Sequence, residues 1–157
     1  MESGPSTENS RLRIFPPVLF VAGLVIGLLL QWIVPLTILP FDVPRWPGAL
    51  LLMSGILLAL WGRDTMAAAG TSPNPASATT TLVTTGPFRF SRNPLYVAST
   101  LAYLGVALLV NSLWVLLLLA PILLVMHFGI VRGEERYLAA QFGDAYRDYC
   151  ARVRRYL

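Results

Sequence analysis

The chain has 157 residues, of which 55% are hydrophobic and only 13% are charged. Because the apolar residues come in long blocks, this composition excludes an ordinary soluble domain and indicates a single-domain integral membrane protein. The formal net charge is +4, and all twelve basic residues are arginines. These arginines lie beside apolar blocks and form no extended basic stripe, so we expect no nucleic-acid partner. The single cysteine, Cys150, cannot form an internal disulfide.

The first half of the chain predicts a polar tail and two spans. Residues 1–13 are mostly polar and predict a disordered cytoplasmic tail ahead of a membrane domain at residues 14–157. The next apolar run predicts a span over residues 16–34, with no small-residue cleavage site after it. Gly23 and Gly27 form a GxxxG pattern there, which either allows close helix approach or is ordinary for a membrane helix. A proline-rich turn then leads to a second span over residues 48–69.

A polar loop separates the second span from the stretch Gly86–Tyr96, which we expect to organise the functional site. Pro87 and Pro94 each fix their own φ and bias the preceding residue towards an extended conformation. This stretch is therefore a shaped loop. Its arginines and phenylalanines lie at a membrane boundary.

Two further spans follow, over residues 95–110 and 113–131. The third is short against the ~20 residues needed to cross a bilayer, and Asn111-Ser112 predicts a tight break after it. Pro121 predicts a kink in the fourth span.

The remaining residues, 134–153, are charged and amphipathic. They predict a helix on the membrane surface with a break at Gly143-Asp144.

The distribution of arginines predicts the topology. Two precede the first span, three lie between the second and third spans, and six follow the fourth, whereas Arg45 alone is on the other side. By the positive-inside rule, both termini and the central loop face the cytoplasm, so Gly86–Tyr96 and Glu134-Glu135 share one side. We expect a multi-pass protein of a bacterial inner membrane.

The residues on this side predict the kind of ligand. The carboxylates of Glu134 and Glu135, with neighbouring aromatic rings, suit a cationic group, while arginines suit a carboxylate or phosphate. The composition is compatible with S-adenosylmethionine, which carries both kinds of charge. Equally, the arginines could hold lipid headgroups or fix topology, and the two glutamates could simply begin a helix. We expect no metal site, because His127 is the only histidine and lies in an apolar helix without clustered partners.

The second half of the chain resembles the isoprenylcysteine carboxyl methyltransferase family and its relatives among phospholipid methyltransferases. The matching blocks are Leu82–Arg89, Ser91–Tyr96, Glu134-Glu135 with Leu138, and Phe142-Gly143 with Tyr146, Tyr149 and Val153. The resemblance implies an S-adenosylmethionine-dependent methyltransferase. The apolar runs themselves predict an all-α fold of about four spans with a C-terminal amphipathic cytoplasmic helix. Four spans are fewer than the eukaryotic enzymes of this family have, so the sequence does not predict a prenyl-substrate tunnel of their kind.

The resemblance also implies roles for individual residues. It implies catalytic roles for Glu135 and Arg92, and a substrate-binding role for Arg132, whose carry-over is weaker because it is offset from the family arginine. Arg89 is expected to bind the substrate for a different reason, because an arginine at headgroup depth can hold a carboxylate or phosphate. The resemblance implies a cofactor pocket formed by Gly86, Pro87, Phe88, Arg92, Asn93, Pro94, Tyr96, Glu134 and Glu135. The family often has histidine where Asn93 stands, and an amide cannot titrate.

The implied acceptor is a lipid-like or prenylated small molecule in contact with membrane lipids, methylated most directly on a carboxylate. Three alternatives stay open. They are a phospholipid amine N-methyltransferase, a nicotinamide-dependent sterol-type reductase, which Tyr149-Cys150 and Arg152-Val153 resemble, and a non-catalytic membrane module. The sequence does not predict the oligomeric state.

Overall fold

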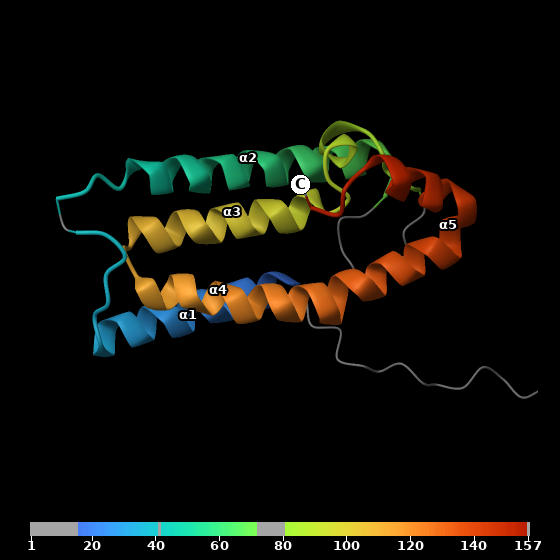
Figure 1. Ribbon diagram of the computed structural model, residues 1–157. Coiled ribbons are helices and arrows are strands. Elements are labelled where there is room, and N and C mark those ends of the chain that lie inside the picture. The colour runs from blue at the N-terminus through green and yellow to red at the C-terminus, as the bar shows by residue number, and fades with distance from the viewer. Residues whose placement is uncertain (1–15, 41, 72–80, 157) are drawn as a thin grey trace, which may run out of the picture.

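A computed structural model describes residues 16–40, 42–71 and 81–156, and every regular element in those ranges is a helix (Figure 1). The predicted all-α fold class is therefore confirmed, while the predicted tail at residues 1–13 lies outside the described ranges. The elements in chain order are α1 (Pro16–Ile33), α2 (Trp46–Ala68), the 3₁₀ helix η1 (Gly86–Arg89), α3 (Pro94–Leu109), α4 (Leu113–Val125), the π-helical segment η2 (Met126–Val131) and α5 (Arg132–Arg152).

Three helices in the described part of the chain are long and apolar enough to cross a membrane. They are α1, α2 and the continuous helix Leu113–Arg152, which begins with α4. The fourth apolar helix, α3, has 16 residues, fewer than the ~20 that cross a bilayer unaided. The fold is that of a multi-pass membrane protein in which α3 depends on its neighbours.

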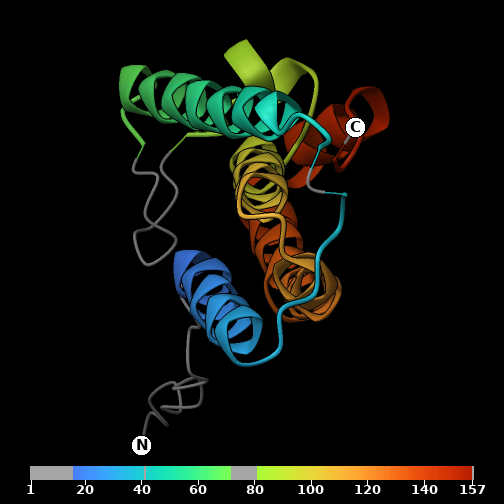
Figure 2. The same ribbon diagram turned by 90° about the vertical axis from the view of Figure 1, so that its left-hand side faces the viewer.

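The four apolar helices pack as two pairs, α2 against α3 and α1 against α4 (Figures 1 and 2). Gly48, Gly55 and Gly62 recur every seven residues on the face of α2 that meets α3. A Cβ atom added at Gly55 would lie 2.6 Å from both the backbone nitrogen of Ala102 and the carbonyl oxygen of Ala98. The two backbones therefore approach so closely that only glycine fits.

The GxxxG pattern of α1 serves the second pair. A Cβ atom at Gly27 would lie 2.9 Å from the Cα atom of Val115 on α4, and one at Gly23 would collide with the side chain of Ile122. Of the two interpretations that the sequence allows, the structure supports close helix approach, here within one chain.

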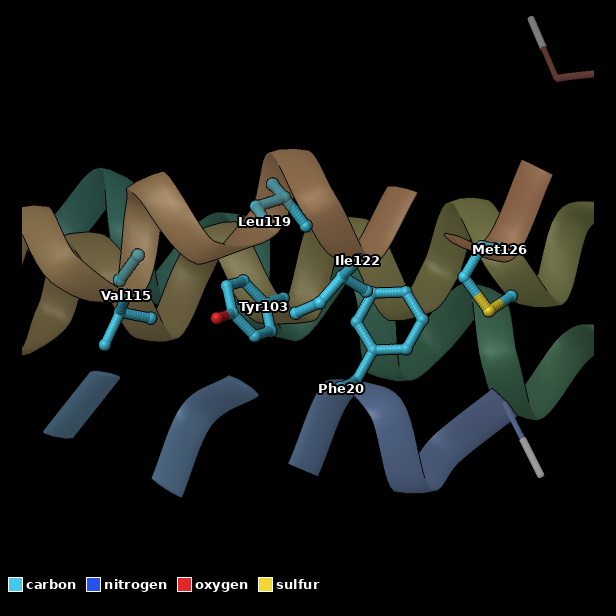
Figure 3. Close-up of a cluster of buried hydrophobic side chains, with 7 residues drawn as sticks. Phe20, Tyr103, Val115, Leu119, Ile122 and Met126 are labelled. Atoms are coloured by element: carbon cyan, nitrogen blue, oxygen red, sulfur yellow. The ribbon is translucent and has the colours of Figure 1, made fainter. Parts of the chain in front are cut away.

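A small apolar core joins the two pairs (Figure 3). Tyr103 reaches from α3 to Phe20 of α1, with ring centroids 6.0 Å apart in an edge-to-face arrangement. The other labelled members of the cluster, Val115, Leu119, Ile122 and Met126, come from α4 and η2.

The turn between α3 and α4 ties the loop after α1 to this core. Asn111 has a φ of 53°, and its side-chain oxygen accepts hydrogen bonds from the backbone N–H groups of Ile38 and Leu39 at 3.1 and 2.8 Å. The side-chain amide in turn donates to the carbonyl oxygen of Leu39 at 2.8 Å. The predicted break at Asn111-Ser112 is confirmed, and it also fixes a distant loop.

The helix that contains α4 changes type further along than expected. The predicted kink was at Pro121, yet α-helix continues to Val125 and the π-helical turns follow at Met126–Val131. The predicted break at Gly143 is confirmed, since this residue has φ 54° and ψ −123° inside α5. After the break, α5 turns back and brings the end of the described chain beside the start of α3 (Figure 1).

Candidate functional site

The loop before α3 is shaped by contacts with α2 and α5. Gly86 has a φ of +57°, and a Cβ atom there would lie 2.5 Å from Oγ1 of Thr65 on α2, so a glycine is required. Pro87 is fully buried. The hydroxyl of Tyr149, from the last turns of α5, donates to the carbonyl oxygen of Phe88 at 2.7 Å. The loop is thus held from both sides.

The residues after α5 lie along this loop through main-chain contacts. The backbone N–H of Arg92 donates to the carbonyl oxygen of Arg154 at 2.9 Å. The side chains of Asn93 and Ser91 donate to the carbonyl oxygen of Arg155 at 3.0 and 3.3 Å. Asn93 therefore serves here as a hydrogen-bond donor that joins the two segments.

Glu135 lies at the centre of a three-residue ion cluster. Arg155 donates from Nε to Oε1 and from Nη2 to Oε2 of Glu135, both at 2.8 Å. Arg92 Nη1 lies 3.1 Å from the same Oε1 atom. The side chains of Arg92 and Glu135 are only 13% and 16% exposed, whereas that of Arg155 is 39% exposed. Two guanidiniums thus neutralise one carboxylate at the edge of the fold.

Arg92 is fixed by a second contact. Its Nη1 atom donates to the sulfur of Cys150 at 2.7 Å. Its Nε atom is buried and has no hydrogen-bond partner in the structure. A buried guanidinium N–H that has no partner among the described residues is costly, so Arg92 is held in place at the expense of this one donor.

Glu134 points away from the ion cluster. Its Oε1 atom accepts a hydrogen bond from the hydroxyl of Tyr96 at 2.7 Å. Burial raises the pKa of the Glu134 carboxyl, and the hydrogen bond from Tyr96 offsets only part of that effect. The two adjacent glutamates therefore have different surroundings: Glu135 is ion-paired, whereas Glu134 is half-buried beside a phenol.

His127 has a partner that the sequence did not indicate. Its Nδ1 atom lies 2.8 Å from the hydroxyl of Tyr156, beyond the end of α5. Among the described residues, no group of three or more His, Cys, Asp or Glu side chains could hold a metal ion.

An open cavity of about 750 Å³ adjoins the ion cluster. Its lining residues come from loop 91–93, from η2, from α5 on both sides of Gly143 and from the segment after α5: Arg92, Phe128, Arg132, Glu135, Arg136, Ala139, Tyr146, Arg147, Cys150 and Arg155. Five arginines and one carboxylate thus face the same space, which favours a ligand with an anionic group. Burial raises the pKa of the Tyr146 phenol, so its hydroxyl stays protonated and adds no charge to the cavity.

The structure brings only some of the predicted site residues into this cavity. Arg92, Arg132 and Glu135 line it. Gly86, Pro87, Phe88, Asn93 and Pro94 form the loop that frames it, and Glu134 and Tyr96 lie behind it. Arg89 is exposed and is not among the lining residues.

Sequence reasoning missed three residues at the site. Arg155 and Cys150 contact Glu135 and Arg92, and Tyr146 forms part of the wall. The helical recurrence of Tyr146 and Tyr149 marked them as inward-facing, but no sequence signal selects Arg155 from the six arginines that follow the fourth span.

Comparison with known proteins identifies relatives of the chain. The phospholipid methyltransferase family matches residues 43–145. The cobalt-zinc-cadmium resistance protein CzcN of Cupriavidus metallidurans is 36% identical over 122 residues, which are 72% of this chain and 53% of that protein. The nickel-cobalt-cadmium resistance protein NccN of Alcaligenes xylosoxydans xylosoxydans is 32% identical over 74 residues, 47% of this chain and 34% of that protein. The chain therefore spans about half the length of the first relative and a third of the second. No solved structure shows a significant match.

Proposed function

Because this chain belongs to the phospholipid methyltransferase family, we propose that it transfers a methyl group from S-adenosylmethionine to an amphiphilic acceptor in the membrane. The observation that carries this proposal is the meeting of loop 91–93 with Glu135 at one cavity. Arg92 Nη1 lies 3.1 Å from Oε1 of Glu135, although 43 residues separate them in the chain. Both residues were expected to act together from the resemblance to isoprenylcysteine carboxyl methyltransferases.

The cavity fits the proposed cofactor in size and chemistry. A volume of about 750 Å³ is within the ~300–1,000 Å³ typical of small-molecule sites. Phe128 and Tyr146 offer aromatic faces, and Glu135 offers a carboxylate for an amine. When bound, S-adenosylmethionine supplies an electrophilic methyl group whose transfer leaves S-adenosylhomocysteine. The protein's contribution is to hold donor and acceptor aligned and to exclude water.

The charges around the cavity support a carboxylate acceptor of the isoprenylcysteine type. A carboxylate is ionised at neutral pH and requires no base. Arg132 and Arg136, which have no ion pair among the described residues, line the cavity and attract it. An amine acceptor would have to lose a proton, but both carboxylate oxygens of Glu135 already accept hydrogen bonds from Arg155. The phospholipid amine alternative therefore has less support from the geometry, although it is the activity that the family's name describes.

The names of the two relatives connect those proteins with resistance to metals. The part of this chain that the structure describes offers no group of three or more metal-ligating side chains. We therefore do not carry a metal site over to this chain, and treat methyl transfer as the activity to be tested first.

Binding of S-adenosylhomocysteine is the first test. Calorimetry on the detergent-solubilised full chain should show saturable binding at one site per chain. Glu135→Ala and Arg92→Ala should each weaken binding by about 1–3 kcal/mol, the range for a lost charge-assisted hydrogen bond. Arg63→Ala is the matched control, because Arg63 is an exposed arginine of α2 outside the cavity and should leave binding unchanged.

A labelled methyl donor incubated with membranes that contain the protein should then mark a lipid-extractable product. Folded wild-type protein that binds no S-adenosylhomocysteine rejects the proposal. Binding of a reduced nicotinamide in its place would favour the reductase alternative. Turnover confined to water-soluble acceptors would contradict the amphiphilic acceptor alone.

A further inference from the structure

Arg155 occupies the carboxylate that the proposed cofactor needs. Its guanidinium binds both oxygens of Glu135 at 2.8 Å, in the two-pronged geometry that suits an arginine and a carboxylate. A ligand amine that reaches Glu135 must therefore displace Arg155. In the structure without ligand, the guanidinium of Arg155 thus takes the place on Glu135 that the amine of a ligand would take.

The two arginines on Glu135 differ in how firmly they are held. Arg92 is 13% exposed and also contacts Cys150, so it cannot leave without breaking buried contacts. Arg155 is 39% exposed, and within the described ranges its side chain donates hydrogen bonds to Glu135 alone. Because Arg155 is the more exposed of the two arginines and has fewer contacts to lose, it is the partner that a ligand can replace.

The main chain at Arg155 can stay in place during such a replacement. The carbonyl oxygen of Arg155 accepts from the side chains of Asn93 and Ser91, and that of Arg154 accepts from the backbone N–H of Arg92. These contacts hold the backbone and leave the Arg155 side chain free to rotate. The released guanidinium therefore stays at the cavity wall, which it already lines.

We propose that Glu135 and Arg155 together form the receptor for the amino-acid end of the cofactor, and that each becomes the partner of one of its charges. This inference rests on the proposed function. The ligand's ammonium group replaces the guanidinium on Glu135, and the ligand's carboxylate binds the released Arg155. One internal ion pair is thus exchanged for two with the ligand, so no charge is left unpaired. Ligands that carry only one of the two charges cannot complete the exchange.

The experiment compares two ligands on wild-type protein and on Arg155→Gln. One ligand is S-adenosylhomocysteine, which carries the amine and the carboxylate. The other is its decarboxylated analogue, which carries the amine alone. Calorimetry gives both dissociation constants for the full chain in detergent, with no turnover required.

The exchange predicts effects of opposite sign. Arg155→Gln should raise the dissociation constant for S-adenosylhomocysteine about ten-fold or more, because the ligand's carboxylate loses its charged partner. The same variant should bind the decarboxylated analogue more tightly than wild type does, because the competitor for Glu135 is gone. Arg155→Lys, which keeps the charge without the two-pronged geometry, should give intermediate values for both ligands. Arg152→Gln should change the affinity for neither ligand, because Arg152 is exposed and its side chain donates to the carbonyl oxygen of Asp148, away from Glu135.

The outcomes separate the two proposals. Suppose that wild-type protein binds S-adenosylhomocysteine, and that Arg155→Gln either weakens the binding of both ligands alike or affects neither. This result overturns the exchange and leaves the proposed function standing. Wild-type protein that binds neither ligand rejects the proposed function and the exchange together. Thermal unfolding of each variant, compared with wild type, identifies any general loss of fold.

Discussion

At the scale of single residues, the adjacent glutamates show how position sets chemistry. Glu135 faces the cavity and is ion-paired with Arg92 and Arg155. Glu134 is one residue earlier, about 100° away around the helix, and meets Tyr96 behind the cavity wall. The sequence alone treats the two as a pair, but the helix directs them to different partners.

The raised pKa of Glu134 gives a pH-dependent prediction. Burial raises this pKa above its ordinary value of 4.5, so the folded protein holds the proton more tightly than the unfolded chain does. This contribution to stability is fully present below about pH 4.5 and is lost as pH rises through the folded-state pKa. Glu134→Gln mimics the protonated carboxyl and still accepts from Tyr96. Its thermal midpoint should match that of wild type near pH 4 and exceed it increasingly towards pH 8.

Glu135→Gln is the matched control for this measurement. It loses ion pairs with Arg92 and Arg155, so it should have a lower midpoint than wild type at pH 8. If the thermal midpoints of Glu134→Gln and wild type differ by the same amount from pH 4 to pH 8, the raised pKa of Glu134 is contradicted.

At the scale of helices, packing depends on where side chains are missing. The face of α2 that meets α3 carries Gly48, Gly55 and Gly62, and the face of α1 that meets α4 carries Gly23 and Gly27. Within a bilayer, helix association depends on such close packing, since lipid tails are as apolar as the side chains. The exposed leucines, isoleucines and valines of both helices are then the surfaces that face lipid.

Gly55→Ala tests this packing. The added methyl group would lie 2.6 Å from the backbone of α3, so the pair must separate, and we expect a destabilisation of about 1–3 kcal/mol from overpacking. The readout is the thermal midpoint of the protein in detergent. Gly133→Ala is the control, because a Cβ atom there meets nothing within 4 Å and alanine favours helix. Equal midpoints for Gly55→Ala and wild type would show that the α2–α3 contact is looser than described.

At the scale of the whole molecule, the elements that line the cavity, η2 and α5, lie at one end of the helix bundle with the start of α3, and the turn between α3 and α4 lies at the other end (Figure 1). The arginines follow this division: eleven of the twelve are predicted on the side of the cavity, and Arg45 precedes α2 at the opposite end. The positive-inside rule then predicts that the cavity faces the cytoplasm.

Reporter fusions test this orientation. A reporter active only in the cytoplasm should be active when fused after Leu157 and inactive when inserted at Asp42, between α1 and α2. A reporter active only outside the cytoplasm should give the reverse pattern. Activity of an external reporter at the C-terminus would contradict the predicted topology and would place the cavity on the other face of the membrane.

Much of the fold can be predicted from the sequence, because apolar runs and their breaks determine helices in a bilayer. The apolar runs before and after Asn111 form α3 and α4. The break predicted at Gly143 occurs there because this glycine adopts a positive φ. The site is only partly predictable. Arginine counts indicate a side of the membrane, but the choice of Arg155 as the partner of Glu135 depends on the reversal of α5 at Gly143 and on hydrogen bonds from Asn93. The π-helical segment likewise depends on packing that no local pattern records.

The shortness of the turn at Asn111 has a consequence for biosynthesis. Only Val110, Asn111 and Ser112 separate α3 from α4. This connection is too short for α3 to insert across the membrane by itself while α4 is still being synthesised. With only 16 residues, α3 is also a weak insertion signal by itself. The two helices must therefore enter the bilayer together as a hairpin, after the ribosome has completed α4, and the side chain of Asn111 crosses with them before it reaches Leu39.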